Sequence, residues 1–404
     1  MRKKPFDIAP VTFRSMPFWC VGNPLSDPFG GSVLPKIDSL EVARILADAA
    51  QEGLIEMTSF HDDDLVAWDP KKPEDDLDPN SETSKKLKAI KKILDDAGLK
   101  INMATCSLHS NTLFRDGGLT NPDPKIRKIA RKKVERTIRI GAFFGAKYLT
   151  YWVARDGFEV PVAVDWKNVY SWLADALNGA YDYIKANKFT NYAGMTIEPK
   201  PNEPRGDLYF PTTGHMLAFI ETLDHPEMVG VNPEFAHESM AGLNFVHAVA
   251  QALDAGKLFH IDLNDQAFGR YDQDFRFGAV SLKNSFFLVK LLEDNGYKGS
   301  RHFDAHAYRT ENYEGVKDFA RGCMRSYLIL KEKVQKFNTD AEIQGLLKEI
   351  NQELPELKNT DGKYTPEKMK ALKDYAFDRN ALSDFGMKYE KLDQLTNELL
   401  WGIR

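Results

Sequence analysis

The feature that most constrains the fold is a regular alternation along most of this 404-residue chain, in which short apolar runs are each followed by a longer helical pattern. The runs are rich in β-branched and aromatic residues, which is typical of buried strands. They cover residues 18–21, 54–60, 100–108, 148–154, 195–201, 228–235, 257–265 and 300–307. The helical patterns cover residues 39–51, 82–97, 124–144, 166–186, 237–255 and 282–294, with Ser39 as the expected N-cap of the first.

Eight nearly continuous apolar strands that alternate with helices indicate a parallel sheet buried on both faces. We therefore predict an α/β fold, a closed (β/α)8 TIM barrel, which needs roughly 250 residues. The alternative is a doubly wound open sheet. That fold would carry a glycine-rich phosphate loop after its first strand, whereas this chain has Gly22-Asn23-Pro24 there.

The strands stop near residue 336, so we predict two parts: a catalytic barrel over residues 1–336 and a helical C-terminal arm over residues 337–404. The arm contains the helix breakers Pro355, Gly362 and Pro366. A segment this thin cannot bury a core of its own. Its apolar end, with Leu395, Leu399, Leu400 and Trp401, is expected to pack on the barrel or on a neighbouring subunit.

Composition narrows the class of protein. The formal net charge of −5 argues against a nucleic-acid or anionic-membrane partner, and no apolar run is long enough to span a bilayer. The three cysteines are far apart, which argues against a disulfide framework. We expect an intracellular, cytoplasmic enzyme. The basic run 125–136 is interpreted as a solvated helix face, and residues 71–78 as a polar surface loop.

Carboxylates fall at the ends of four successive predicted strands. They are Glu198, Glu234, Asp262 and Asp304. The C-terminal ends of barrel strands converge on one face, so these side chains should meet there. Clustered carboxylates repel one another unless a cation lies between them, and oxygen ligands suit Mg2+ or Mn2+.

A second group of ligands adjoins the first. His237 is three residues after Glu234, and Asp272 and Asp274 follow the seventh strand. These residues could hold a second divalent ion, with Glu234 bridging the two. For any one of them taken alone, a helix cap or a surface group is the ordinary interpretation.

Further polar and aromatic residues lie near the same strand ends. His61, followed by three aspartates, could move protons near neutral pH. Lys200 could polarise a substrate oxygen, or it could form a salt bridge with Glu203 or Asp207. The aromatic residues Trp19, Phe29 and Trp152 could form apolar walls that exclude water, or they could belong to the core.

Several segments resemble the xylose isomerase family, in its shorter form, from about residue 8 to the end. The most specific are Glu-Pro-Lys-Pro-Asn-Glu-Pro-Arg-Gly-Asp at 198–207 and the segments within 230–278; further similar segments are His-Asp-Asp-Asp at 61–64, Asp-Pro-Phe-Gly at 27–30, Phe-Arg-Asp-Gly-Gly at 114–118, residues 322–331 and residues 389–404. The resemblance implies a homotetramer that interconverts D-xylose and D-xylulose, and D-glucose and D-fructose. The reaction proceeds by ring opening and a metal-assisted hydride shift between C1 and C2.

The resemblance also implies roles for individual residues. Glu198, Glu234, Asp262 and Asp304 would hold one divalent ion, and Glu234, His237, Asp272 and Asp274 a second, with Mg2+ as the ion and Mn2+ or Co2+ as substitutes. Lys200 would bind the carbonyl oxygen at C1, and His61, oriented by Asp64, would help to open the ring. The sugar-binding residues would be Trp19, Thr105, His109, Trp152, Lys200 and Phe29, the last from a neighbouring subunit.

The chain departs from the family pattern at three places. His109 stands where the family usually has Phe, His306 where it has Lys, and Val153-Ala154 where it has Gly-Gly. None of these changes removes an expected ligand, but they should alter sugar preference. Three alternatives remain: an isomerase of another aldose, a metal-dependent phosphodiesterase on a related barrel, and a sugar-binding protein without turnover.

Overall fold

A computed structural model describes residues 14–22, 37–308, 311–352, 358 and 360–404 of the chain. The chain divides into two compact units, Met1–Leu330 and Lys331–Arg404. Each unit is described by itself below. Among the described residues, helices long enough to cross a bilayer are too polar to do so.

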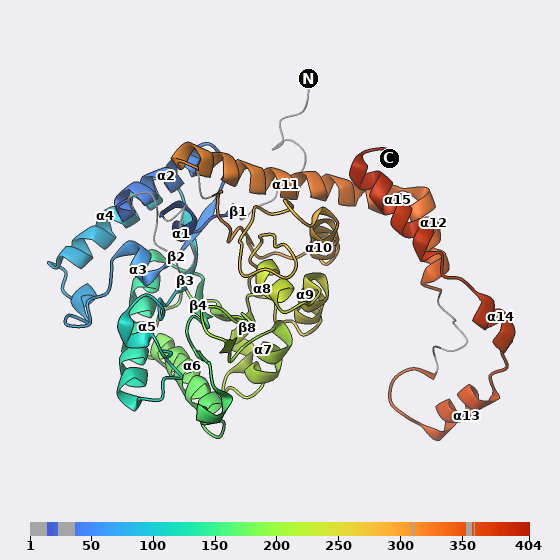
Figure 1. Ribbon diagram of the computed structural model, residues 1–404, viewed down its shortest axis with the longest axis horizontal. Coiled ribbons are helices and arrows are strands. Elements are labelled where there is room, and N and C mark those ends of the chain that lie inside the picture. The colour runs from blue at the N-terminus through green and yellow to red at the C-terminus, as the bar shows by residue number, and fades with distance from the viewer. Residues whose placement is uncertain (1–13, 23–36, 309–310, 353–357, 359) are drawn as a thin grey trace. The chain divides into compact units, whose positions relative to one another are not determined.

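The first unit is built on a curled sheet of seven parallel strands (Figure 1). In sheet order they are β8 (Val229–Val231), β6 (Gly194–Glu198), β4 (Tyr148–Trp152), β3 (Lys100–Thr105), β2 (Met57–His61), β1 (Arg14–Ser15) and β9 (Arg301–His302). The predicted strand at 257–265 lies between the two edges, where it makes the parallel bridges Val231↔Leu258, Glu234↔Asp262 and Asp262↔His302. These bridges close the sheet, which confirms the predicted (β/α)8 barrel.

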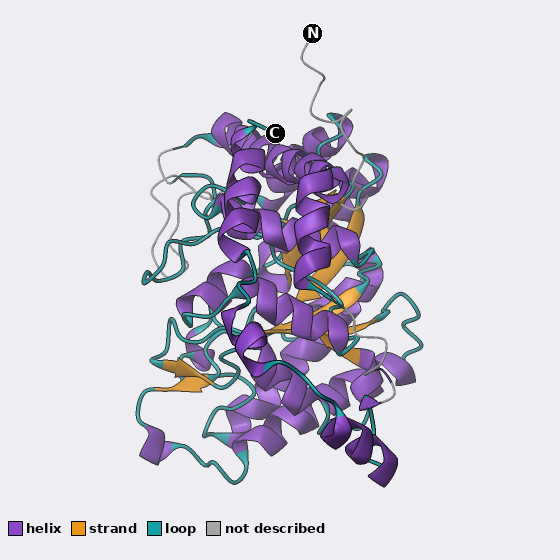
Figure 2. Cartoon of the chain, turned by 90° about the vertical axis from the view of Figure 1, so that its right-hand side faces the viewer, coloured by secondary structure: helices purple, strands orange, loops and turns teal. Residues whose placement is uncertain are grey.

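Helices surround the seven-stranded sheet of this unit (Figure 2). The larger ones are α2 (Ser39–Gln51), α4 (Glu82–Asp96), α5 (Pro124–Phe144), α6 (Val169–Ala186), α7 (Thr213–Ile220), α9 (Phe245–Asp254), α10 (Leu282–Asp294) and α11 (Tyr313–Thr339), which continues into the second unit. Short helices α3 (Asp62–Leu65) and α8 (Phe235–Met240) follow β2 and β8 directly. A two-stranded antiparallel sheet joins β5 (Gly157–Phe158) to β7 (Asp207–Leu208).

The prediction of a strand at residues 18–21 was wrong. These residues form helix α1 (Phe18–Gly22), and the first strand is Arg14–Ser15. A short apolar run fits a buried strand and a buried helical turn equally well. Here Phe18, Cys20 and Val21 are all buried, so periodicity could not decide between the two.

Two helix boundaries also differ from the expectation. The pattern at 237–255 is two helices, α8 and α9, separated by a turn in which Gly242 has a φ of 73°. The N-cap of α2 is Asp38, whose carboxylate accepts from the Leu40 amide at 2.8 Å. Ser39 is the first helical residue, and its hydroxyl donates to the Leu65 carbonyl instead.

The basic run 125–136 is only partly a solvated face, so that interpretation was wrong for two of its members. Lys133 and Arg136 on α5 are fully buried, and both form ion pairs with the buried Asp62. The acidic loop 71–78 is likewise not wholly exposed, because the carboxylate of Asp76 is nearly buried against Arg139.

The second unit is helical. It contains the end of α11, then α12 (Ala341–Ile350), α13 (Pro366–Asp374), α14 (Arg379–Asp384) and α15 (Tyr389–Trp401). Helices α12 and α15 pack together. Leu395, Leu399 and Leu400 are buried within this unit, whereas Trp401 is 67% exposed. Between residues 360 and 394 the unit has no buried residue.

Candidate active site

The C-terminal ends of the barrel strands bring the predicted carboxylates together. Glu198 is the last residue of β6, and Glu234 follows β8 as the N-cap of α8. Asp262 is bridged to Glu234 on one side and to His302 of β9 on the other. Asp304 comes two residues after β9. A closed parallel barrel places these strand ends on one face.

The ligand atoms form three groups, within each of which the atoms lie less than 4.8 Å apart. The groups are Glu234–Asp262–Asp304, Glu198–Glu234–His237 and Glu234–Asp272–Asp274. Glu234 belongs to all three. The fold therefore places one carboxylate between the two predicted sets of ligands.

Burial and mutual repulsion control the ionisation of most of these acids. Burial, and after it the charges of neighbouring carboxylates, raises the pKa of four of them well above the usual range. These four are Glu198, Glu234, Asp274 and Asp304. Carboxylates so close together need either protons or a cation between them.

Asp272 is an exception because it contacts two donors. Burial alone would raise its pKa, but Lys200 and His237 outweigh burial and lower it. The Lys200 Nζ lies 2.7 Å from Asp272 Oδ2 and 3.4 Å from Glu203 Oε2. The expected salt bridge to Glu203 is therefore present, together with one to Asp272 that the sequence did not indicate.

His237 lies among the carboxylates. Its Nδ1 is 3.3 Å from Glu234 Oε2, and its Nε2 is 3.2 Å from Asp272 Oδ2. Burial lowers the pKa of His237. Neither His237 Nδ1 nor Asp272 Oδ1 has a hydrogen-bond partner among the described residues. Unpartnered buried atoms, hard oxygen donors and an imidazole together fit a divalent cation.

A cavity of about 450 Å3 opens beside these groups. Its wall contains the predicted residues Trp19, His61, Thr105, His109, Trp152 and Lys200, together with His306. Of the predicted metal ligands, Asp262 alone does not line the cavity. The predicted contact residue Phe29 lies outside the described residues.

The aromatic wall surrounds His61. The ring centroid of His61 is 4.4 Å from that of Trp19, 5.5 Å from that of His109 and 6.2 Å from that of Trp152. Its Nδ1 lies 3.3 Å from Asp64 Oδ2, which also accepts from the His61 amide. Asp64 thus contacts both the ring and the backbone of His61.

Two asparagines of the site were not predicted from the sequence. Asn232 donates to Asp262 and Glu198, and Asn264 donates to Glu234 Oε1 and Asp274 Oδ1 at 2.7 and 2.9 Å. Each lies two residues from a predicted ligand in extended chain, so that the two side chains share a face. A polar residue two positions from a predicted ligand, within an apolar run, could have indicated these asparagines in the sequence.

The fold and site define a class: a (β/α)8-barrel enzyme whose grouped carboxylates and imidazole could hold divalent metal ions. Residues 47–322 match the family described as "xylose isomerase-like TIM barrel". The chain is 49% identical to xylose isomerase from Thermus thermophilus and 47% identical to that from Thermus caldophilus, each over 96% of both chains. The chain belongs to the xylose isomerase family and is an aldose–ketose isomerase.

The solved structures support the fold alone. A putative xylose isomerase from Rhodospirillum rubrum superposes with a TM-score of 0.57. The alignment covers 80% of this chain and 99% of that one, at 15% sequence identity.

Proposed function

We propose that this isomerase converts D-xylose into D-xylulose and also accepts D-glucose, giving D-fructose. The supporting observation is the cavity, whose lining combines the grouped carboxylates with the aromatic side chains of Trp19 and Trp152. Such a cavity can bind the hydroxyl groups of an open-chain sugar while its apolar wall excludes water. The names of the relatives at 49% and 47% identity support xylose as the substrate.

We propose two divalent cations per subunit, Mg2+ in the native enzyme, with Mn2+ or Co2+ able to substitute. One would be held by Glu198, Glu234, Asp262 and Asp304, and the other by Glu234, His237, Asp272 and Asp274. When bound, the cations supply Lewis acidity toward the sugar oxygens, which assists the hydride shift between C2 and C1. The shared position of Glu234 in all three ligand groups supports this assignment.

The chain's own residues bind the sugar and move its protons. Asp64 holds Nδ1 of His61, which leaves Nε2 to carry the proton of the C1 hydroxyl to the ring oxygen as the bond between C1 and that oxygen breaks. The Lys200 ammonium, kept charged beside Asp272, donates a hydrogen bond to the oxygen at C1. Trp19 and Trp152 exclude water from the migrating hydrogen, and Thr105 and His109 contact the sugar hydroxyls.

We also propose a cytoplasmic homotetramer in which the arm 337–404 packs on a neighbouring subunit and Phe29 reaches a neighbour's cavity. The absence of buried residues between 360 and 394 supports the proposal for the arm. Apolar side chains left without intramolecular cover are typical of a subunit interface.

The test is turnover of D-xylose after EDTA treatment, with Mg2+, Mn2+ or Co2+ added back singly. We expect activity to disappear and then to return with the metal. Glu234→Gln should lower kcat/KM at least about 100-fold, because several kcal/mol of transition-state stabilisation depend on the cations.

The matched control is Glu227→Gln, which changes an exposed glutamate of the helical turn before β8 and should leave kcat/KM unchanged. Full activity in EDTA would contradict the metal assignment. Turnover of another aldose but not of D-xylose by the metal-loaded enzyme would contradict the proposed substrate.

A further inference from the structure

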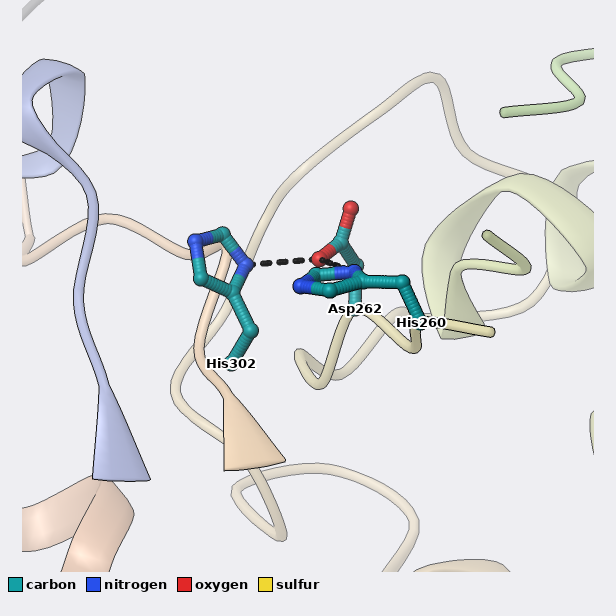
Figure 3. Close-up of side chains that lie close together, drawn as sticks. All are labelled: His260, Asp262 and His302. Atoms are coloured by element: carbon teal, nitrogen blue, oxygen red, sulfur yellow. Dashed lines mark hydrogen bonds and ion pairs between the residues drawn. The ribbon is translucent and has the colours of Figure 1, made fainter. Parts of the chain in front are cut away.

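A buried polar cluster lies behind Asp262. Figure 3 shows the imidazoles of His260 and His302 pointing toward one oxygen of its carboxylate. His302 Nδ1 is 2.6 Å from Asp262 Oδ1, and His260 Nδ1 is 3.4 Å from the same atom. All three side chains are fully buried. Nothing in the proposed reaction uses either imidazole directly.

The outer nitrogen of each ring is bonded to a further buried side chain. His302 Nε2 lies 2.5 Å from the Ser59 hydroxyl on β2. His260 Nε2 is hydrogen-bonded to Asn102 of β3, which also donates to Ser300. The cluster thus crosses the barrel interior and ties Asp262 to strands on the far side.

The donor and the acceptor of each hydrogen bond around His260 can be assigned. The Asn232 amide nitrogen donates to Asp262 Oδ2 at 2.6 Å and to Glu198. Its oxygen must therefore accept, so the proton of His260 lies on Nδ1, 2.6 Å away. His260 Nε2 then accepts from Asn102, which requires a neutral ring. Burial above all lowers the pKa of His260 to about 3, in agreement with that tautomer.

The three side chains could themselves be taken for a metal site, because their ligand atoms lie within 4.8 Å of one another. The hydrogen bonds argue against this. Asp262 is an acceptor, so His302 Nδ1 must donate to it, and His260 Nδ1 donates to Asn232. A nitrogen that carries a proton cannot ligate a metal.

The cluster also sets the charge of Asp262. Burial would raise its pKa, but His302, His260 and Asn232 outweigh burial and lower it. Glu198 and Asp304, its neighbours in the same proposed set of ligands, have raised pKa values.

We propose that His302, supported by Ser59, and the His260–Asn232 pair are positioning residues that hold the Asp262 carboxylate in one orientation for a divalent cation. This inference rests on the proposed metal assignment. It is specific to the set formed by Glu198, Glu234, Asp262 and Asp304. The other set contains Asp272 and Asp274, which have different donors, Lys200 and Asn264.

The test is a titration of the metal-free full-length protein with Mn2+. Electron paramagnetic resonance and calorimetry monitor the binding and give a separate affinity for each of the two sites. His302→Leu removes the hydrogen-bond donor to Asp262. It should lower the Mn2+ affinity of the site that contains Asp262 by about 10- to 100-fold, which is the usual effect of losing the hydrogen-bond partner of a metal ligand. The other site should stay within about threefold of wild type. His302→Asn, whose amide can replace Nδ1–H, should recover most of the lost affinity.

A purely structural role would lower the melting temperature and affect both sites, or neither, without recovery in His302→Asn; either result overturns the proposal. If His302→Leu does not fold, Ser59→Ala decides, because an unchanged affinity of both sites would contradict the proposed support of His302. Asp262→Asn separates the two proposals. If it retains two wild-type sites, the metal assignment fails and this inference fails with it. If it loses a site that His302→Leu keeps intact, only this inference fails.

Discussion

At the scale of single residues, burial raises the pKa of the clustered carboxylates unless charged or imidazole donors outweigh it. Asp262 and Asp272 contact imidazole, ammonium or amide donors and have lowered pKa values. Glu234 and Asp274 have Asn264 as an amide donor, but burial, and after it neighbouring charges, raises their pKa values. Carboxylates with raised pKa values would release protons when a cation binds among them.

His109 is the residue at which this chain's sugar specificity should differ most from the family pattern. Burial holds the pKa of its imidazole well below the usual range, so it is a neutral donor and acceptor at the cavity wall. His109→Phe should raise KM for D-xylose about fivefold, since one hydrogen bond contributes about 1 kcal/mol. We expect the preference between xylose and glucose to change as well.

Steady-state kinetics with both sugars checks this prediction. The control is His225→Phe, which changes a half-buried histidine outside the cavity wall and should leave both constants unchanged. An unaltered KM and sugar preference in His109→Phe would show that the imidazole does not contact the sugar.

At the scale of elements, a buried ion pair fixes two walls of the cavity. Lys133 of α5 lies 2.7 and 2.6 Å from the two oxygens of Asp62, the residue that follows His61. Asp62 also accepts from the Ser107 amide at 2.9 Å, two residues before His109. One carboxylate thus ties α5 both to the turn after β2 and to the segment after β3.

Lys133→Met should lower the free energy of unfolding by about 3–5 kcal/mol, because it leaves the Asp62 charge buried with one partner fewer. Lys132→Met, one residue away on the exposed side of α5, is the control and should change stability by less than about 0.5 kcal/mol. Denaturant unfolding measures both. Equal stabilities for the two variants would refute the importance of the buried pair.

At the scale of the whole molecule, the two units differ in how they bury apolar surface. The first unit encloses its strands within helices. The second buries Ile343, Leu346 and three leucines of α15, Leu395, Leu399 and Leu400, but exposes the large apolar side chains near α14. Phe377, Leu382 and Phe385 are 58, 63 and 51% exposed. A second copy of the chain would cover such a surface.

The wild-type protein should therefore have a solution mass of about four times the chain mass of 45.9 kDa. The triple variant Phe377→Ser, Leu382→Ser, Phe385→Ser should have a smaller mass, because it removes apolar area that the interface needs. Light scattering after size exclusion gives both masses. The control changes Lys370, Lys373 and Asp374, exposed polar residues of α13, to Ser. A monomeric wild type, or an unaltered mass in the triple variant, would contradict the proposed arm.

The sequence by itself determined the barrel and the acids at its strand ends, because both depend on local patterns. Apolar runs alternating with helical periodicity define the β/α units, and a carboxylate next to such a run marks a strand end. Residues 18–21 show the limit of that reasoning, since four apolar residues fit either a strand or a helical turn.

Only the tertiary structure decided which charges are buried and which groups meet. Lys133 lies in a basic helical run that resembles a solvated face, yet it is buried because Asp62, 71 positions away, comes to lie against it. His302 and Ser59 are 243 positions apart and become partners when the barrel closes. The state of a buried polar group depends on partners that are distant in the chain, and local sequence does not encode them.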